Sequence, residues 1–131
     1  MTAGYSGTPL PRKLGVKPGS RVLLDGAPDG FALEGIDAHR RPGSAPYDVV
    51  LLFSADADRL RRRWPALAAR LTESGRLWVC WPKRTSGRQT DLSENDVRTY
   101  GLSQGLVDVK VCAIDDVWSG LAFVSRLADR G

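Results

Sequence analysis

A seven-residue run with a single charged side chain, Tyr47–Phe53, constrains the fold of this chain more than any other feature of its sequence. Polar and apolar residues do not alternate in it, so it predicts a strand buried on both faces. Apolar runs at residues 21–25 and 76–81 predict two further strands. At residues 56–73, leucines and a tryptophan recur at helical spacing. Strands that alternate with helices predict an α/β domain with a mainly parallel sheet.

The C-terminal part of the chain predicts one more helix and a hairpin. The helix begins at Ser93, which opens a capping-box pattern, and ends near Gly105. Residues 107–114 and 121–126 predict two strands joined by a short turn. The predicted architecture is a three-layer, Rossmann-like α/β fold. Its sheet has about five mostly parallel strands, with one antiparallel strand in the C-terminal hairpin.

Three residues mark the expected limits and shape of the helix at 56–73. Ser54 is a candidate N-cap, and Gly75 is a candidate C-terminal stop. Pro65 lies inside the pattern and predicts a kink or a helix in two pieces. A short helical turn is also expected at residues 9–14, ahead of the first strand.

Length and composition indicate a single domain over residues 1–131 in a reducing, cytoplasmic compartment. No apolar run approaches the ~18 residues of a membrane span. The net charge of +4 favours anionic partners without requiring one. Cys80 and Cys112 are each expected inside a strand, and the strand order implied by the resemblance described below puts one strand between them. That arrangement predicts two free, buried thiols, because two strand spacings exceed the reach of a disulfide.

Three segments are similar to landmarks of one enzyme fold. Residues 17–26, 47–53 and 71–79 resemble the first strand with its glycine loop, the fourth strand, and the approach to the fifth strand of S-adenosylmethionine-dependent methyltransferases. Residues 107–126 resemble the antiparallel last hairpin of that fold. The resemblance implies that strand 121–126 lies antiparallel between strands 107–114 and 76–81. Nearly the whole chain also resembles a family of short bacterial proteins, and this resemblance implies the fold and no activity. The residues that carry it are 4–10, 81–83, 90–92, 105–112 and 118–121.

Three departures from the methyltransferase pattern bear on its chemistry. Leu24 stands where the glycine loop has an acidic residue, and Pro28 replaces its middle glycine. Residues 27–47 are too few for two strands and two helices, so the acidic residue that would hold a ribose is expected to be missing. The Asn/Asp-Pro-Pro-Tyr motif of base-modifying methyltransferases is absent, and residues 53–56 stand in its place. These departures predict a methyltransferase-like domain with a shortened first half and no bound cofactor.

The carboxyl ends of the predicted strands are expected to form one shallow cleft, because open α/β sheets bind ligands there. Its candidate residues are Asp25, Gly26, Gly30, Lys83, Arg84, Ser86, Trp118 and Ser119. The loop after residue 82 combines three cations with hydroxyl side chains and a glycine, a composition that suits phosphate or another anion. Because it is not a Walker loop, an ordinary solvated loop is the favoured interpretation and an anion site is the alternative. We predict no catalytic residue and no metal site, and we expect His39, the one histidine, on the surface.

Arginines cluster on the predicted helix at 56–73. They are Arg59, Arg61, Arg62 and Arg63, to which Arg40 and Arg41 add. A solvated helix face is the favoured interpretation, and a nucleic-acid surface is the alternative, because such arginines can bind phosphates but no recognisable binding motif accompanies them.

Function is the least constrained property of this sequence. The favoured hypothesis is a non-enzymatic binding or interaction module that has lost cofactor chemistry. The first alternative is a small-molecule methyltransferase that uses S-adenosylmethionine through an altered loop at Gly26–Gly30. The second is a binder of anions or nucleic acid. A small anionic ligand, a protein partner and a homodimer each fit the sequence, whereas a membrane does not.

Overall fold

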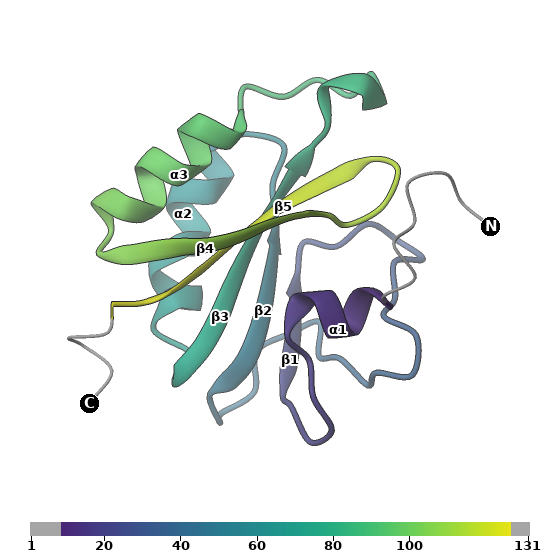
Figure 1. Cartoon of the computed structure of the whole chain (residues 1–131), viewed down its shortest axis with the longest axis vertical. Coiled ribbons are helices and arrows are strands. Elements are labelled where there is room, and N and C mark those ends of the chain that lie inside the picture. The colour runs from purple at the N-terminus through teal and green to yellow at the C-terminus, as the bar shows by residue number, and fades with distance from the viewer. Residues whose placement is uncertain (1–8, 127–131) are drawn as a thin grey trace.

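The computed structural model describes residues 9–126 and contains one five-stranded sheet (Figure 1). Its strands are β1 (Val22–Asp25), β2 (Tyr47–Phe53), β3 (Leu71–Pro82), β4 (Leu106–Ala113) and β5 (Trp118–Ser125). Their order is β1-β2-β3-β5-β4. β1 to β3 are parallel to one another, and β5 runs antiparallel to both β3 and β4. The predicted fold class and the place of the antiparallel strand are confirmed.

Helices and loops cover both faces of the sheet, which makes three layers (Figure 1). On one face lie α2 (Ala57–Ala68) and α3 (Glu94–Ser103). On the other lie α1 (Leu10–Leu14) and the irregular segment 26–46. The apolar run of β2 serves both sides, because Val50 and Leu52 join the first core while Leu51 and Phe53 join the second.

The boundary between α2 and β3 differs from the prediction. The helix ends at Ala68 and the strand begins at Leu71, so residues assigned to the helix pair with β2 instead. Gly75 is not a helix stop but lies within β3, where the register to β2 shifts. A Cβ at this position would stand 3.0 Å from the carbonyl oxygen of Tyr47. The glycine therefore permits the close approach of the two strands.

The N-terminus of α2 also differs from the prediction. The N-cap is Asp56, whose carboxylate accepts from the backbone N–H of Arg59 at 2.7 Å. Ser54 lies two residues earlier, is buried, and donates its hydroxyl to the carbonyl of Asp56. Pro65 lies inside a helix that continues to Ala68 as one piece. Ser93 caps α3 through the predicted capping box with Asp96.

The segment between β1 and β2 contains no further strand or helix within the described residues. One isolated bridge pairs His39 with Leu23 beside β1. The backbone N–H of His39 donates to the carbonyl of Val22, and its carbonyl accepts from Leu24, both at 2.8 Å. Within the described part of the chain, His39 alone therefore occupies the position beside β1 that a further strand of the sheet would take. No helix in residues 9–126 is long and apolar enough to cross a membrane.

Candidate functional site at the carboxyl edge of the sheet

Three loops meet at the carboxyl edge of the parallel strands. They follow β1 at residues 26–32, follow β3 at residues 83–93, and join β4 to β5 at residues 114–117. The backbone N–H of Lys83 donates to the carbonyl of Val117 at 2.7 Å, which ties the second loop to the third. Thr90 ties the second loop to the end of β2, because its hydroxyl donates to the carbonyl of Ala55 at 2.6 Å.

The loops enclose two neighbouring clefts, of which the smaller has a volume of about 450 Å³. We call it the β1-side cleft, and its lining residues are Leu10, Pro28, Asp29, Gly30, Phe31, Ala32, Arg88, Ile114, Asp115, Val117 and Trp118. Its wall is mainly apolar and aromatic. The rings of Phe31 and Trp118 each meet Phe53 edge to face, with centroids 5.0 and 5.2 Å apart.

Two carboxylates lie in the β1-side cleft, and only one of them accepts hydrogen bonds from residues 9–126. The carboxylate of Asp115 accepts from the backbone N–H groups of Val117 and Trp118, each at 2.8 Å, and so holds the hairpin turn. Asp29 is exposed and has no ion pair or hydrogen bond to its carboxylate within residues 9–126. It precedes Gly30, whose φ of +83° fits the turn closed by Phe31 N–H and the Pro28 carbonyl. Asp29 is therefore the free acceptor of this cleft.

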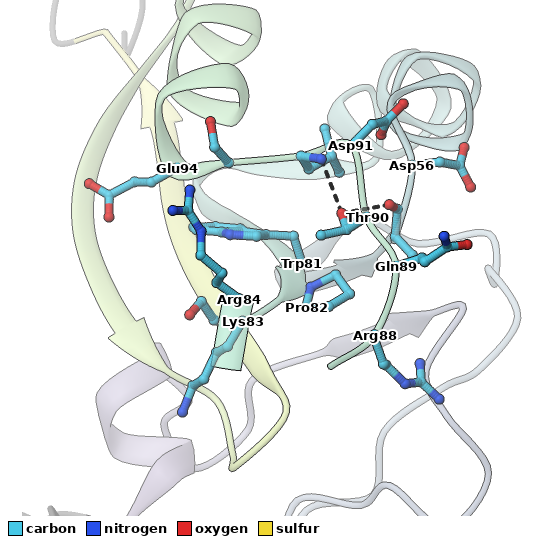
Figure 2. Close-up of a pocket in the computed structure, with 14 residues that line it drawn as sticks. Asp56, Trp81, Pro82, Lys83, Arg84, Arg88, Gln89, Thr90, Asp91 and Glu94 are labelled. Carbon is cyan, nitrogen blue, oxygen red and sulfur yellow. Dashed lines mark hydrogen bonds between the residues drawn. The ribbon is translucent and has the colours of Figure 1, made fainter. Parts of the chain in front are cut away.

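The larger cleft has a volume of about 920 Å³ and lies beyond the end of β3 (Figure 2). We call it the β3-side cleft, and its lining residues are Ala55, Asp56, Trp81, Pro82, Lys83, Arg84, Arg88, Gln89, Thr90, Asp91, Leu92, Ser93, Glu94 and Ser119. Arg88 lines both clefts. Its guanidinium lies over the ring of Trp118, 5.5 Å from the centroid. The two clefts are thus neighbours that share one cation.

The structure divides the single cleft predicted from the sequence. Gly30 and Trp118 line the β1-side cleft, whereas Lys83, Arg84 and Ser119 line the β3-side cleft. Ser86 lines neither, because its hydroxyl donates to the carbonyl of Lys83 at 2.6 Å and closes the short 3-10 turn Arg84–Ser86. Sequence analysis did not name Asp29 as a candidate site residue. Its position in the glycine loop after β1 was the feature that could have pointed to it.

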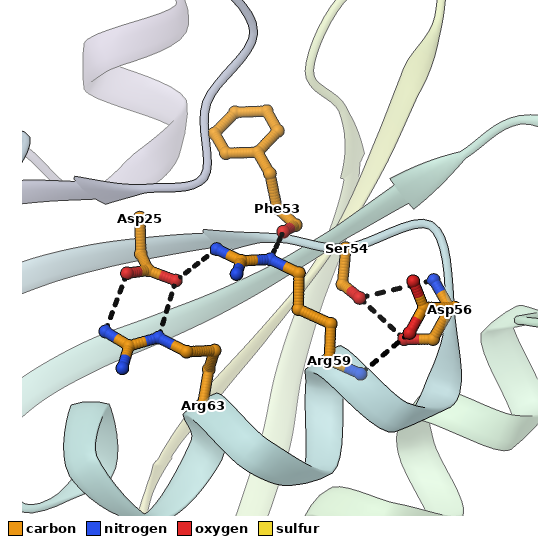
Figure 3. Close-up of polar contacts among 6 residues, drawn as sticks. All are labelled: Asp25, Phe53, Ser54, Asp56, Arg59 and Arg63. Carbon is orange, nitrogen blue, oxygen red and sulfur yellow. Dashed lines mark hydrogen bonds and ion pairs between the residues drawn. The ribbon is translucent and has the colours of Figure 1, made fainter.

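Asp25 and Gly26 also line neither cleft. Two arginines of α2 bind the carboxylate of Asp25 (Figure 3), whereas Gly26 itself is exposed. Asp25 is 8% exposed and pairs with Arg59 at 2.7 Å and with Arg63 at 2.8 Å. The hydrogen bond from Arg63 to Asp25 raises the pKa of the guanidinium above its ordinary value. Arg59 packs against Gly26 so closely that a Cβ there would overlap its guanidinium. The space beside Gly26 is filled by a side chain.

The arginine cluster predicted on α2 is not one solvated face. Arg59 and Arg63 bind Asp25, and Arg61 forms an exposed pair with Asp58. His39 is exposed, as predicted, and its ring bonds the hydroxyl of the buried Tyr47 at 2.7 Å. Among residues 9–126 there is no group of three side chains that could hold a metal ion.

The cysteines confirm the strand order. Cys80 and Cys112 are free, and both pair with Gly120, one from each side of β5. Cys80 is buried as predicted, whereas Cys112 is half-buried.

Three solved structures share this fold. The chain matches DhpI in complex with S-adenosylhomocysteine (TM-score 0.53, 13% identity, 82% of this chain and 67% of DhpI). It matches LepI in complex with S-adenosylmethionine (TM-score 0.53, 13% identity, 89% of this chain and 39% of LepI). It matches TnmH with a TM-score of 0.50 and 18% identity over 89% of this chain and 46% of TnmH. No family model and no curated protein matches the chain.

These likenesses establish a methyltransferase-like Rossmann fold, as the sequence resemblance implied. The chain spans less than half the length of LepI and of TnmH. The prediction that no cofactor is bound is wrong, because DhpI and LepI hold S-adenosylhomocysteine and S-adenosylmethionine in this fold. Departures in one loop are a weak guide to cofactor loss, since other loops at the same sheet edge also line the clefts.

Proposed function

We propose that this chain binds S-adenosylmethionine or S-adenosylhomocysteine in its β1-side cleft and acts as a small methyltransferase. The observation that carries the proposal is the lining of that cleft, in which an apolar, aromatic wall faces the free carboxylate of Asp29. Its volume of about 450 Å³ falls in the ~300–1,000 Å³ range of small-molecule sites. The complexes of DhpI and LepI support it, because their fold is shared.

The residues of the cleft fit the chemical parts of such a molecule. Phe31, Ile114 and Trp118 offer apolar surface to an adenine ring, and Asp29 offers an acceptor to ribose hydroxyls. Arg88 offers a guanidinium to a carboxylate. S-adenosylmethionine, when bound, supplies an activated methyl group on a positively charged sulfur. Asp29 thus takes the part of the ribose-binding acidic residue that was expected to be missing together with the strands and helices between β1 and β2.

Ligand binding is tested by calorimetric and thermal-shift titration of the full chain with both molecules. A ligand at a hundred times its dissociation constant adds about 2.7 kcal/mol to the free energy of unfolding. This corresponds to a rise in melting temperature on the order of 10 °C. No heat and no shift at millimolar concentrations of either molecule would refute the proposal.

The position of the bound molecule is tested by a matched pair of variants. Asp29→Asn is expected to weaken S-adenosylhomocysteine binding about tenfold, because it removes the charged acceptor. Asp37→Asn removes the same charge from an exposed position outside both clefts, and affinity should stay within about twofold. Equal weakening in both variants would place the ligand elsewhere.

The non-enzymatic module favoured by the sequence differs from this proposal in one measurable respect. A binding module would retain S-adenosylmethionine unchanged in the presence of acceptor molecules. A methyltransferase would convert it to S-adenosylhomocysteine. Chromatographic measurement of that conversion separates the two hypotheses once binding has been shown.

A further inference from the structure

The β3-side cleft is the larger of the two, and the proposed function leaves it unoccupied. It adjoins the β1-side cleft through Arg88 and through the neighbouring residues Trp118 and Ser119. A molecule in the larger cleft would therefore lie beside one in the smaller cleft. This placement suits the second substrate of a transfer reaction, because proximity of the two reactants is what a two-substrate site must supply.

The acidic side chains around the β3-side cleft are engaged with donors of the protein. Asp56 accepts from the backbone N–H of Arg59 at 2.7 Å, and Asp91 accepts from that of Ala57 at 2.9 Å. Glu94 pairs with Arg98 at 2.7 Å. These carboxylates are thus compensated by the first turn of α2 and by an arginine of α3.

The cations around the same cleft are not compensated. Lys83, Arg84 and Arg88 form no ion pair within residues 9–126. Figure 2 shows Lys83 and Arg84 pointing to opposite sides from the end of β3, with Arg88 across the cleft from both. Three free cations therefore surround the mouth of this cleft. Their combined potential attracts an anion, and guanidinium groups bind phosphate with paired hydrogen bonds.

The floor of the cleft is apolar. Trp81 and Pro82 end β3 there, and Trp81 is 6% exposed. A bare ion would leave most of the 920 Å³ empty. The combination of an apolar floor and a cationic rim suits an organic molecule with a charged group at one end.

We propose that the β3-side cleft binds the second substrate, a small organic molecule that carries a phosphate group. Arg84 binds the phosphate with paired hydrogen bonds, Lys83 and Arg88 add positive potential at the mouth of the cleft, and the organic part lies against Trp81. The role of this molecule as methyl acceptor rests on the proposed function, whereas its binding does not.

The test uses the full chain and three probes at constant ionic strength: phenyl phosphate, inorganic phosphate and phenol. Phenyl phosphate should bind about tenfold more tightly than either of the others, since only it matches both floor and rim. Lys83→Ala with Arg84→Ala should weaken phenyl phosphate binding at least about tenfold. The control, Lys17→Ala with Arg62→Ala, removes two exposed cations outside both clefts and should change affinity less than about twofold.

Several outcomes would overturn this inference. If phenyl phosphate binds no better than phenol, the phosphate site is refuted. Equal weakening of phenyl phosphate binding by the two double variants would refute it as well. If a short single-stranded DNA binds more tightly than phenyl phosphate, and the Lys83→Ala, Arg84→Ala variant loses that binding, the cations are assigned to nucleic acid instead. Perturbation of the Trp81 indole N–H signal by phenyl phosphate in the unmodified chain locates the probe without relying on any variant.

S-adenosylhomocysteine titrations of the same proteins separate this inference from the proposed function. The Lys83→Ala, Arg84→Ala variant should retain S-adenosylhomocysteine affinity within about threefold, because neither residue lines the β1-side cleft. If the chain binds S-adenosylhomocysteine but does not bind phenyl phosphate, only the acceptor site is refuted. If the chain binds phenyl phosphate but does not bind S-adenosylhomocysteine, the cofactor proposal is refuted and the phosphate site stands.

Discussion

Arg59 donates a hydrogen bond to Asp25 at 2.7 Å and lies against Gly26 as it does so. The contact joins the end of β1 to α2, two elements 34 residues apart in sequence. The same guanidinium donates to the carbonyl of Phe53 at the end of β2. One side chain thus fixes the carboxyl ends of two parallel strands and fills the turn after β1. The ligand site proposed above lies farther along that loop, at Asp29 and Gly30.

Asp25→Asn is expected to destabilise the protein by about 2 kcal/mol, because the buried carboxylate bonds two arginines. Both arginines are about 30% exposed and can recover some hydration, which limits the loss. Urea unfolding measures the change. Arg61→Ala is the control, since its pair with Asp58 is exposed and should contribute less than about 0.5 kcal/mol. A loss in Asp25→Asn no larger than in the control would contradict the assigned role.

Gly101→Ala is expected to destabilise the protein by about 1–2 kcal/mol although alanine favours helices. A Cβ at Gly101 would overlap the ring of Phe123, where α3 packs against β5. Thr99→Ala lies in the same helix on an exposed position and should be neutral or slightly stabilising. Thermal unfolding of the two variants provides the comparison. An unchanged melting temperature for Gly101→Ala would show that α3 can shift away from the sheet without cost.

The strands were predictable because their signals are local. The run at Tyr47–Phe53 is buried on both faces and coincides with β2. The capping pattern at Ser93 likewise requires only neighbours in sequence. The boundary of β3 was not predictable in this way. Leu71 pairs with Tyr47 only because β2 is already in place, and the helical spacing of a leucine carries no information about such a partner.

The candidate site was predictable only as far as topology determines it. Parallel strands bring their following loops to one edge, and there Gly30 and Trp118 line one cleft while Lys83 lines its neighbour. The pairing of Arg59 with Asp25 requires knowledge of side-chain directions across 34 residues, so the sequence could not show that the Arg59 guanidinium packs against Gly26. For the same reason, the sequence could not show that this edge of the sheet carries two clefts rather than one.

Thiol labelling should distinguish the two cysteines in the folded protein. Cys80 is buried and should not react with Ellman's reagent, whereas the half-buried Cys112 should react slowly. Burial raises the pKa of both thiols, so little thiolate is present at neutral pH. In denaturant both cysteines should react rapidly. Rapid reaction of two thiols in the native state would show that β5 does not shield Cys80.

Burial of Cys80 also predicts a loss of stability at alkaline pH. The thiol has its pKa raised well above the ordinary value of 9.0, mainly by burial, so the folded state holds this proton more tightly than the unfolded state does. Its contribution to stability is therefore complete below about pH 9 and declines as the pH rises further. Between pH 8 and pH 10 the free energy of unfolding should fall by on the order of 1 kcal/mol through this group. Cys80→Ala would be less stable throughout, because it leaves a small cavity, but its stability should depend less on pH over this interval. Parallel slopes for the unmodified chain and Cys80→Ala would show that the proton of Cys80 is not linked to folding.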